Sequence, residues 1–560
     1  MKKIYTLVLA QIFAFAALFG QTNETTLYKA MQDEMERSRK ELILPNSPAP
    51  FYIATTVAET RYISVNSSLG AVLSTKESPT ERMHSITMFV GDSKFSSDYA
   101  YSGKGITSAY YTTIDDNYDQ LRRNFWQTSD IAYKFAVEVY NSKKNNLKTA
   151  NIPEEEKTFA DMLPLGKVQS SVAPVAPFSF DKKAYEELAK KVSAVFSKYP
   201  QIYGSRVEID GIQSIYYMTS TEGTKIKEPV SYSSVTLRAK VRNKKGQPME
   251  ESETIIASSL EKLPNADSLA ACAVRFAEHM IAMRDASSMD EYYLGPVLFT
   301  EAATADIFAS NLVSPSGIFA YRKPVQVMAT VYRAENISAR REIKPLEERF
   351  GKKVIDSRIS VDNRTDLADF NGKSLVGTYS VDAQGVVPVK SQSLIENGIL
   401  KGVLSTRVET KRTKESTGAV RFGVRPRSVS MEVAPGTLLI SAPGGASYDD
   451  LKKTLIASAV EEGLDYAYIV KKLTSENTQI IYKVSVKDGS ETLVAGAEIT
   501  PVPLSKLKRV LGVSKEQYVS NYLYLGEVPV SVISPKAILI EDVEINRKPL
   551  QTQKESPLIK

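Results

Sequence analysis

The stretch Tyr293–Phe308, "YLGPVLFTEAATADIF", joins an apolar run to the start of a helix. The apolar run ends at Phe299, the pattern predicts a helix from Thr300, and Glu301 follows at once. A glutamate at a helix start can serve as a general base when histidines beside it hold a metal ion, yet no histidine stands on either side of Glu301. The stretch is therefore a catalytic segment, the remnant of one, or an ordinary strand-to-helix turn.

The composition is that of a soluble globular protein. The chain has 560 residues, 42% of them hydrophobic and 24% charged, which is enough for two or three domains. Its net charge of +6 arises from 71 basic and 65 acidic residues spread along the chain. This mixed charge argues against a dedicated nucleic-acid binder.

The N-terminus has the pattern of a secretory signal peptide. Lys2 and Lys3 precede an apolar stretch over 4–19, and Gly20 is a small residue at the cleavage point. The stretch is short for a membrane span of about 20 residues, which disfavours an uncleaved anchor. The single cysteine, Cys272, leaves no early lipid-attachment site and no internal disulfide. We expect cleavage near residue 20 and a periplasmic or secreted mature protein.

The first half of the chain repeats one order of elements. The first copy reads helix, two short strand-like runs, strand and helix, at 25–42, 51–57, 61–70, 85–91 and 115–140. The second copy has the same order at 181–199, 206–211, 214–223, 233–243 and 265–284. Random similarity would not preserve such an order, so we expect two related units.

The predicted fold class is α+β, with duplicated N-terminal helix/strand units before a large, mostly antiparallel, β-rich C-terminal domain. A proline-rich segment between the units is predicted to be a linker or an irregular surface excursion. In the C-terminal domain, "YKVSVKDGSETLVAGAEI" predicts a hairpin that turns at Asp488-Gly489. The expected divisions are a signal peptide at 1–20, units at 21–141 and 181–288, a linker at 142–180, and a C-terminal domain at 289–550.

Four stretches in the same order resemble the TldD/PmbA (TldE) metallopeptidase family. They are "YLGPVLFTEAATADIF", "GTYSVDAQGVVPVKSQSLIENGILKGVLSTR", "YKVSVKDGSETLVAGAEI" and "SVISPKAILIEDVEI". The resemblance implies a subunit of a peptidase that trims peptides and unfolded chains and that works as a heterodimer. In that family the TldD-type subunit holds zinc through a His-Glu-x-x-x-His segment and a distant cysteine, whereas the PmbA-type subunit lacks the metal.

This chain resembles the PmbA type because the zinc motif is degenerate. Thr300 stands in the place of the first histidine, Glu301 in that of the glutamate, and Ala305 in that of the second histidine. No cysteine follows Cys272, so the distant ligand is missing as well. The export signal also departs from the cytoplasmic location of the well-known family members.

A catalytic zinc needs three protein ligands, and few other donors remain in this chain. Besides carboxylates they are His84, His279 and Cys272. Cys272 and His279 lie seven residues apart on one predicted helix, which separates them by about 10 Å, whereas donors to one zinc lie within roughly 4 Å of each other. We therefore expect His84 to be solvated, His279 to be an ordinary helix residue, and Cys272 to be a buried, inert thiol.

Two interpretations of Glu301 remain. As a general base it lacks the metal-bound water on which the family chemistry depends. As a structural residue, it interacts with the helix dipole while the Thr300 hydroxyl caps the helix. The second interpretation makes the segment a remnant and leaves no residue assigned as catalytic, cofactor-binding or metal-binding.

The function that we expect is that of an exported, metal-free subunit of a peptidase complex. Its partner is a TldD-like zinc-bearing subunit or a second copy of itself, its substrate is a peptide, and zinc is expected only in the TldD-like partner. No nucleic acid is expected, and no membrane span after signal cleavage. The alternatives are an active metallopeptidase with a non-standard site and a non-catalytic, homodimeric peptide-binding protein.

Overall fold

The computed structural model confirms an α+β fold with a β-rich C-terminal region. It describes residues 24–104, 109–148, 152–172, 174–244, 246–289, 291–325, 327, 344–473 and 479–547. The predicted signal peptide at 1–20 lies outside these described residues. Within the described ranges, no helix combines the length and the apolar character that crossing a membrane requires.

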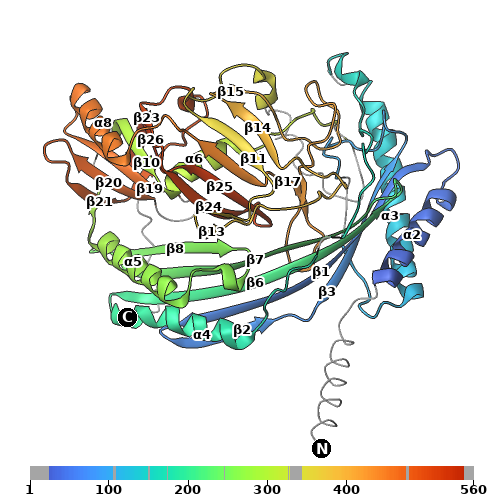
Figure 1. The fold of residues 1–560 in the computed structure, drawn as a ribbon, viewed down its shortest axis with the longest axis horizontal. Helices are drawn as coiled ribbons and strands as arrows, with labels where there is room; N and C mark the ends of the chain where they lie inside the picture. Colours follow the sequence, from blue (N-terminus) through green and yellow to red (C-terminus); the bar gives the residue numbers. More distant parts are fainter. Residues whose placement is uncertain are drawn as a thin grey trace, which may run out of the picture.

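Both N-terminal units contribute to one eight-stranded sheet (Figure 1). The first unit consists of α2 (Glu24–Glu41), β1 (Pro50–Ser68), β2 (Ala71–Glu77), β3 (Glu81–Val90), β4 (Tyr110–Tyr111) and α3 (Tyr118–Asn146). The second consists of α4 (Lys182–Ser193), a 3-10 turn (Ala194–Lys198), β6 (Ile202–Ser220), β7 (Lys225–Arg242), β8 (Pro248–Ala257) and α5 (Ala266–Asp285). The strand order is β4-β3-β1-β6-β7-β5, where β5 is Ser170–Val172, and β2 and β8 pair with β1 and β7.

The two short strands expected in each unit are one long strand, so this prediction was wrong. β1 and β6 each run for 19 residues. In β1, buried Glu59 does not interrupt the strand because the Arg82 guanidinium donates to its carboxylate at 2.8 Å. In β6, Gly211 marks a close approach, since a Cβ there would lie 2.0 Å from the Tyr185 hydroxyl of α4.

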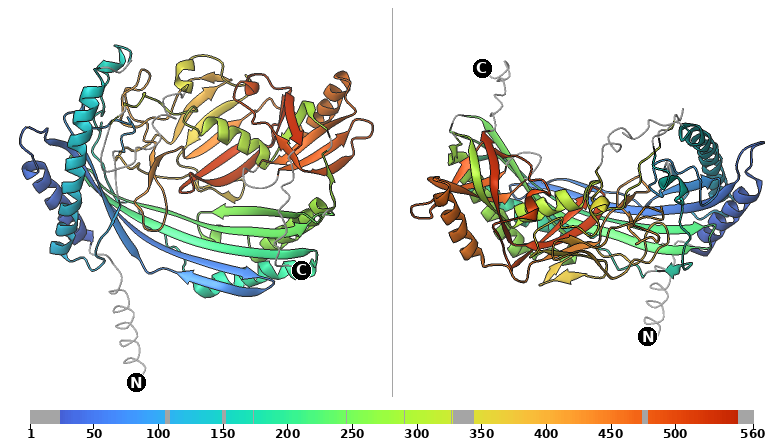
Figure 2. Two further views of the ribbon diagram at one scale, coloured as in Figure 1. Left: turned by 180° about the vertical axis from the view of Figure 1, so that it is seen from behind. Right: turned by 90° about the horizontal axis from the view of Figure 1, so that it is seen from above.

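The two faces of this sheet carry different partners because side chains alternate along each strand. On one face, Val57 packs with α2 and α3, and Val65 packs with α4 and α5. On the other face, Tyr52 and Met218 pack against residues of the C-terminal domain. Figure 2 shows α2 and α3 at one end of the long strands and α4 at the other.

The C-terminal domain has two sheets with α6 (Ala302–Leu312) packed against strands of both. The first sheet contains β22 (Ala497–Ile499), β26 (Ala537–Arg547), β10 (Tyr293–Thr300), β19 (Tyr466–Lys472), β20 (Ile480–Ser485), β21 (Glu491–Ala495), β9 (Ser287–Ser288) and β23 (Gly512–Val513). The second contains β15 (Ile399–Leu400), β14 (Ser391–Glu396), β11 (Ser360–Arg364), β18 (Thr437–Ser441), β25 (Val528–Pro535) and β24 (Gln517–Tyr524). Two small hairpins are β12 (Asp369–Phe370) with β13 (Lys373–Ser374), and β16 (Val420–Phe422) with β17 (Met431–Val433).

Most strand pairs in the C-terminal domain are antiparallel, as the sequence predicted; the exceptions include β10 with β19 and β18 with β25. The predicted hairpin forms from β20 and β21, and its turn contains Gly489 at φ +70°. A further helix, α8 (Tyr448–Glu461), covers the outer face of the first sheet through Leu451 and Leu455. The core between the sheets thus encloses α6. The stretch Tyr293–Phe308, which carries part of the family resemblance, runs from β10 into this helix.

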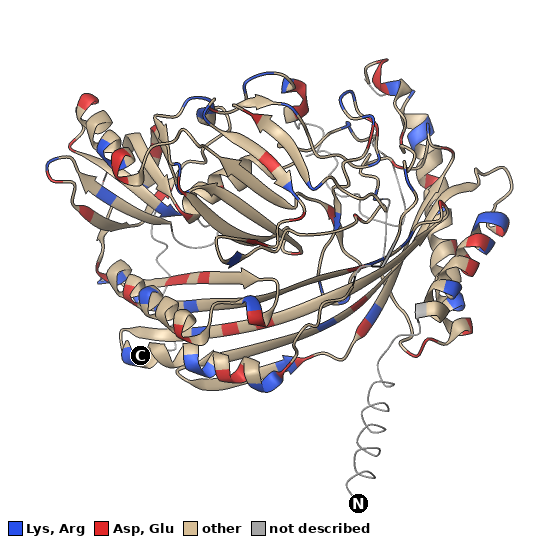
Figure 3. Ribbon diagram, viewed as in Figure 1, with Lys and Arg blue, Asp and Glu red and all other residues tan. Residues whose placement is uncertain are grey.

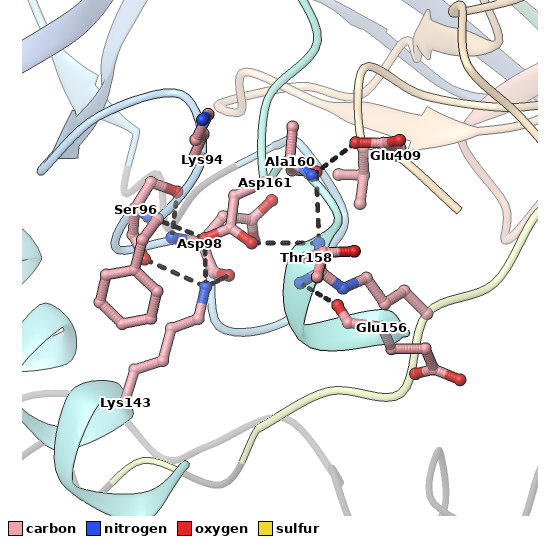
Figure 4. Close-up of polar contacts among 12 residues, drawn as sticks. Lys94, Ser96, Asp98, Lys143, Glu156, Thr158, Ala160, Asp161 and Glu409 are labelled. Carbon is pink, nitrogen blue, oxygen red and sulfur yellow. Dashed lines mark hydrogen bonds and ion pairs between the residues drawn. The ribbon is translucent and has the colours of Figure 1, made fainter. Parts of the chain in front are cut away.

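The segment 142–180 contributes buried residues to the junction between the units and the C-terminal domain. Lys143, at the end of α3, donates to the carbonyls of Ser96 and Asp98 and, at 2.6 Å, to the Asp161 carboxylate (Figure 4). Burial lowers the pKa of Lys143 and raises that of Asp98. Arg322 of the C-terminal domain lies 3.1 Å from the other oxygen of Asp161. These buried charged groups connect the segment 142–180 to the first N-terminal unit and to the C-terminal domain.

We expect Lys143→Met to lower the free energy of unfolding by about 3–5 kcal/mol, because it leaves the Asp161 carboxylate buried without its ammonium partner. The matched control is Lys134→Met on the same helix. Lys134 pairs with Asp130, but these side chains are 60% and 34% exposed, so a change within about 0.5 kcal/mol is expected. Urea denaturation followed by circular dichroism measures both, and equal effects would contradict the assignment.

Candidate functional site

The segment that the resemblance aligns with the zinc motif, from Thr300 to Ala305, forms the junction between β10 and α6. Thr300 is the last residue of β10, is 2% exposed, and lies opposite Ala537 of β26. The Glu301 amide donates to the Lys536 carbonyl at 2.6 Å, which continues the contact with β26 by one residue. The junction is therefore built between the N-terminal and C-terminal strands of this domain, more than 200 residues apart in sequence.

The expected cap by Thr300 was wrong. Thr300 belongs to the strand, and Glu301 takes the N-cap position; no side-chain capping bond forms at it among the described residues. The hydroxyl that stabilises the junction belongs to Thr304, which donates to the Phe299 carbonyl at 2.9 Å. The first turn of α6 is thus held from inside the helix, and the Glu301 carboxylate is left half-buried without a capping role.

Glu301 has a strained backbone, with φ 51° and ψ −120°. This region of positive φ favours glycine, and a side chain with a Cβ is held there at a cost of order 1–3 kcal/mol. Strain of this kind is concentrated at functional sites, where a sharp strand-to-helix turn projects a side chain from the end of a sheet. The strained backbone of Glu301 thus distinguishes this junction from an ordinary strand-to-helix turn.

Neither histidine position offers a zinc ligand. Thr300 and Ala305 are each 2% exposed, and their side chains are a hydroxyl and a methyl. Within the described ranges, no group of three or more His, Cys, Asp and Glu side chains is arranged to hold a metal ion. Of the three motif positions at this junction, only that of Glu301 carries the residue type of the family motif.

The expectation that His84 is solvated was wrong, because α3 covers it. His84 is 1% exposed; its Nε2 lies 2.7 Å from the Thr128 hydroxyl, and its ring meets that of Phe125 edge-on. Burial lowers the pKa of His84 to about 4, so the ring is neutral near pH 7. Its position on β3 places it in the helix-covered face of the N-terminal sheet, away from the β10–α6 junction.

His279 and Cys272 lie on α5, as the sequence predicted. Burial, with Lys472 and Lys471 nearby, lowers the pKa of His279 to about 4. Cys272 is only half-buried, which corrects the expected buried thiol, and its sulfur accepts from the Arg275 guanidinium at 2.9 Å. Neither residue joins Glu301 in a cluster of metal donors within the part of the chain that the structure describes.

Sequence reasoning missed two buried arginines of the C-terminal domain, of which Arg407 connects this domain to the end of the N-terminal sheet. Arg407 is 1% exposed and donates to the Leu163 carbonyl and the Glu222 carboxylate, beyond the end of β6. Arg421 is 2% exposed and donates to the carbonyls of Pro435 and Pro529. The signal for Arg421 was a lone arginine inside the apolar run "AVRFGV".

These features define a class of α+β protein: a duplicated, helix-covered sheet that supports a two-sheet domain with a buried strand-to-helix junction. Charges of both signs are spread over its elements (Figure 3). The family model of the PmbA/TldA metallopeptidase C-terminal domain matches residues 296–547. The C-terminal domain of this chain therefore matches the TldD/PmbA family, as the sequence resemblance predicted.

Solved structures share the fold over nearly the whole chain. A Thermotoga maritima protein, named as a candidate modulator of a DNA gyrase, is 15% identical with a TM-score of 0.59, over 93% of this chain and 100% of that one. TldE from Thermococcus kodakarensis is 15% identical with a TM-score of 0.57, over 92% and 99%. A Bacteroides thetaiotaomicron protein, also named as a candidate modulator of DNA gyrase, is 11% identical with a TM-score of 0.58, over 94% and 99%. No curated protein matches the chain.

Because glycine tolerates the positive φ of Glu301, Glu301→Gly relieves the strain, and we expect the free energy of unfolding to stay the same or to rise by up to about 1 kcal/mol. The control is Glu187→Gly in α4, where glycine lowers the free energy of unfolding by about 0.5–1 kcal/mol. Chemical denaturation of both variants gives the comparison. A loss at Glu301 as large as that at Glu187 would show that the turn is unstrained.

Proposed function

We propose that this chain is the metal-free subunit of a peptidase complex, working beside a TldD-like partner that carries the zinc. The observation that carries the proposal is the β10–α6 junction. It keeps the family glutamate, Glu301, on a strained turn, while Thr300 and Ala305 stand at the histidine positions. Zinc bound in the partner would supply the acidic water that attacks an amide, which a carboxylate alone does not provide.

The residues of this chain then serve assembly and substrate handling. The core that encloses α6 fixes the position of the junction through Thr304 and the Lys536 carbonyl. A rigid junction of this kind can face a partner or a substrate without taking part in bond cleavage. The family match of the C-terminal domain supports the proposal at the level of the metallopeptidase-like class.

We also propose that the protein is exported. Lys2, Lys3 and the apolar stretch that follows support this, because they have the pattern of a signal peptide. N-terminal sequencing of the chain purified from its native envelope provides the check. A mature chain that starts at Met1 in the cytoplasm would contradict export without bearing on the subunit role.

The isolated chain is expected not to hydrolyse unstructured peptides, and addition of the zinc-bearing partner is expected to restore cleavage. Glu301→Gln in this chain should leave that restored cleavage within about twofold, because its carboxylate has no metal-bound water to activate. Peptide digestion followed by mass spectrometry, with the chain alone and then with the partner, separates the cases. Cleavage by the chain alone that disappears in Glu301→Gln would identify an active site and overturn the proposal.

A further inference from the structure

A cavity of about 610 Å³ lies between the N-terminal sheet and the C-terminal domain. Its size is within the range of ligand-binding pockets. One wall is strand β7 from Glu228 to Ser231, and the opposite wall includes Ser374 of β13 and Val376. In Figure 1, β13 lies beside β7 and β8. The Asn521 side-chain amide donates to the carbonyls of Ile256 and Ser374. The cavity is thus framed by backbone from both parts of the molecule.

The wall formed by β7 includes an interrupted strand edge. One edge of β7 pairs with β6 along nearly its whole length. On the other edge, β5 pairs with residues 225–227 and β8 with residues 233–242. Among the described residues, no strand pairs with Glu228–Tyr232 on this second edge. This gap in the ladder spans five residues, about 17 Å at 3.4 Å per residue, and four of them, Glu228–Ser231, line the cavity.

An unpaired strand edge offers main-chain donors and acceptors that an extended peptide can satisfy. Pro229 has no N–H, so an added strand bonds to the remaining amides and to the carbonyls of this stretch. The walls offer apolar contacts through Val230, Leu375 and Phe422 for alternate side chains. The edge is enclosed by the C-terminal domain, which limits access to a single chain and prevents the sheet-to-sheet association that an open edge would allow.

Buried charged groups give the cavity a polar end. Both oxygens of Glu228, which is 4% exposed, accept hydrogen bonds from the Ser380 amide and hydroxyl. Arg421 also lines the cavity; in the described structure its Nε has no hydrogen-bond acceptor, although the atom is buried. An unpaired buried guanidinium N–H is costly, and a carbonyl or carboxylate of a ligand would satisfy Arg421 after a small side-chain shift.

We propose that this cavity binds an extended peptide segment, which adds to the free edge of β7 at Glu228–Tyr232 and directs a carbonyl or carboxylate toward Arg421. The inference rests on the proposed function only for the choice of a peptide chain as the ligand. It places substrate binding at the N-terminal sheet of the proposed metal-free subunit, in a part of the chain separate from the β10–α6 junction.

The test measures binding of a fluorescein-labelled hexapeptide of alternating threonine and valine with one lysine to the full isolated chain, by fluorescence anisotropy. The lysine suits a lining in which Glu228, Glu261 and Asp369 outnumber Lys262 and Arg421. We expect saturable binding. A copy of the peptide that is N-methylated at every residue is expected to bind at least tenfold more weakly, because it offers no main-chain donors to the strand edge.

Two tryptophan variants locate the binding. Ala368 is exposed and lines the cavity, so Ala368→Trp places bulk at the opening without disturbing a buried residue, and at least a tenfold rise in Kd is expected. Val460 on α8 is 55% exposed and is not among the cavity lining, so Val460→Trp should leave the Kd within about twofold. Circular dichroism of both variants confirms that they fold.

The absence of saturable binding, or equal binding by wild type and folded Ala368→Trp, would overturn the cavity as the docking site. Equal binding of the N-methylated peptide would overturn strand addition. Cleavage restored by a zinc-bearing partner without binding here would retain the subunit role and reject this site. Binding here without any cleavage in the presence of such a partner would retain the site and reject the subunit role.

Discussion

The antiparallel pairing of β1 with β6 determines where the helices of both units and the C-terminal domain pack. It runs from Ala54 opposite Ser220 to Ser67 opposite Val207 and joins the two repeated units through their longest strands. Because the pair is antiparallel, the helices of the first unit cover one end of a face and those of the second unit cover the other end. The opposite face is left for the C-terminal domain, where Tyr216 of β6 stacks on Phe422 with ring centroids 4.2 Å apart.

Polar groups that would be expensive to bury singly hold the N-terminal sheet to the C-terminal domain. Arg407 of the C-terminal domain binds the Leu163 carbonyl and the Glu222 carboxylate, and Arg322 of the same domain lies beside the Lys143–Asp161 pair. Each of these contacts draws partners from segments far apart in sequence. Burial of such charges adds little net stability but penalises any arrangement in which a partner is missing. They therefore fix the relative position of the sheet and the domain, and with it the cavity between them.

Much of the element order could be read from the sequence, because helical and strand periodicities are local. The repeated units, the hairpin at Gly489 and the strand-to-helix junction at Glu301 all carry local signals. What failed depended on distant partners: Arg82 keeps Glu59 inside β1, Tyr185 explains Gly211 within β6, and α3 buries His84. The backbone conformation of Glu301 could not be predicted either, because its amide donates to the carbonyl of Lys536, which is more than 200 residues away in sequence. The cavity beside β7 has no local signal at all.

In the proposed role, this chain keeps the family junction while its partner holds the metal. Inductively coupled plasma mass spectrometry of the dialysed protein tests it most directly, with the chain alone and in complex with a TldD-like partner. We expect far less than one zinc per isolated chain and about one per complex, and Glu301→Gln should leave this zinc content unchanged, since a catalytic zinc needs three protein ligands. About one zinc per isolated chain, lost in Glu301→Gln or His279→Gln, would contradict it.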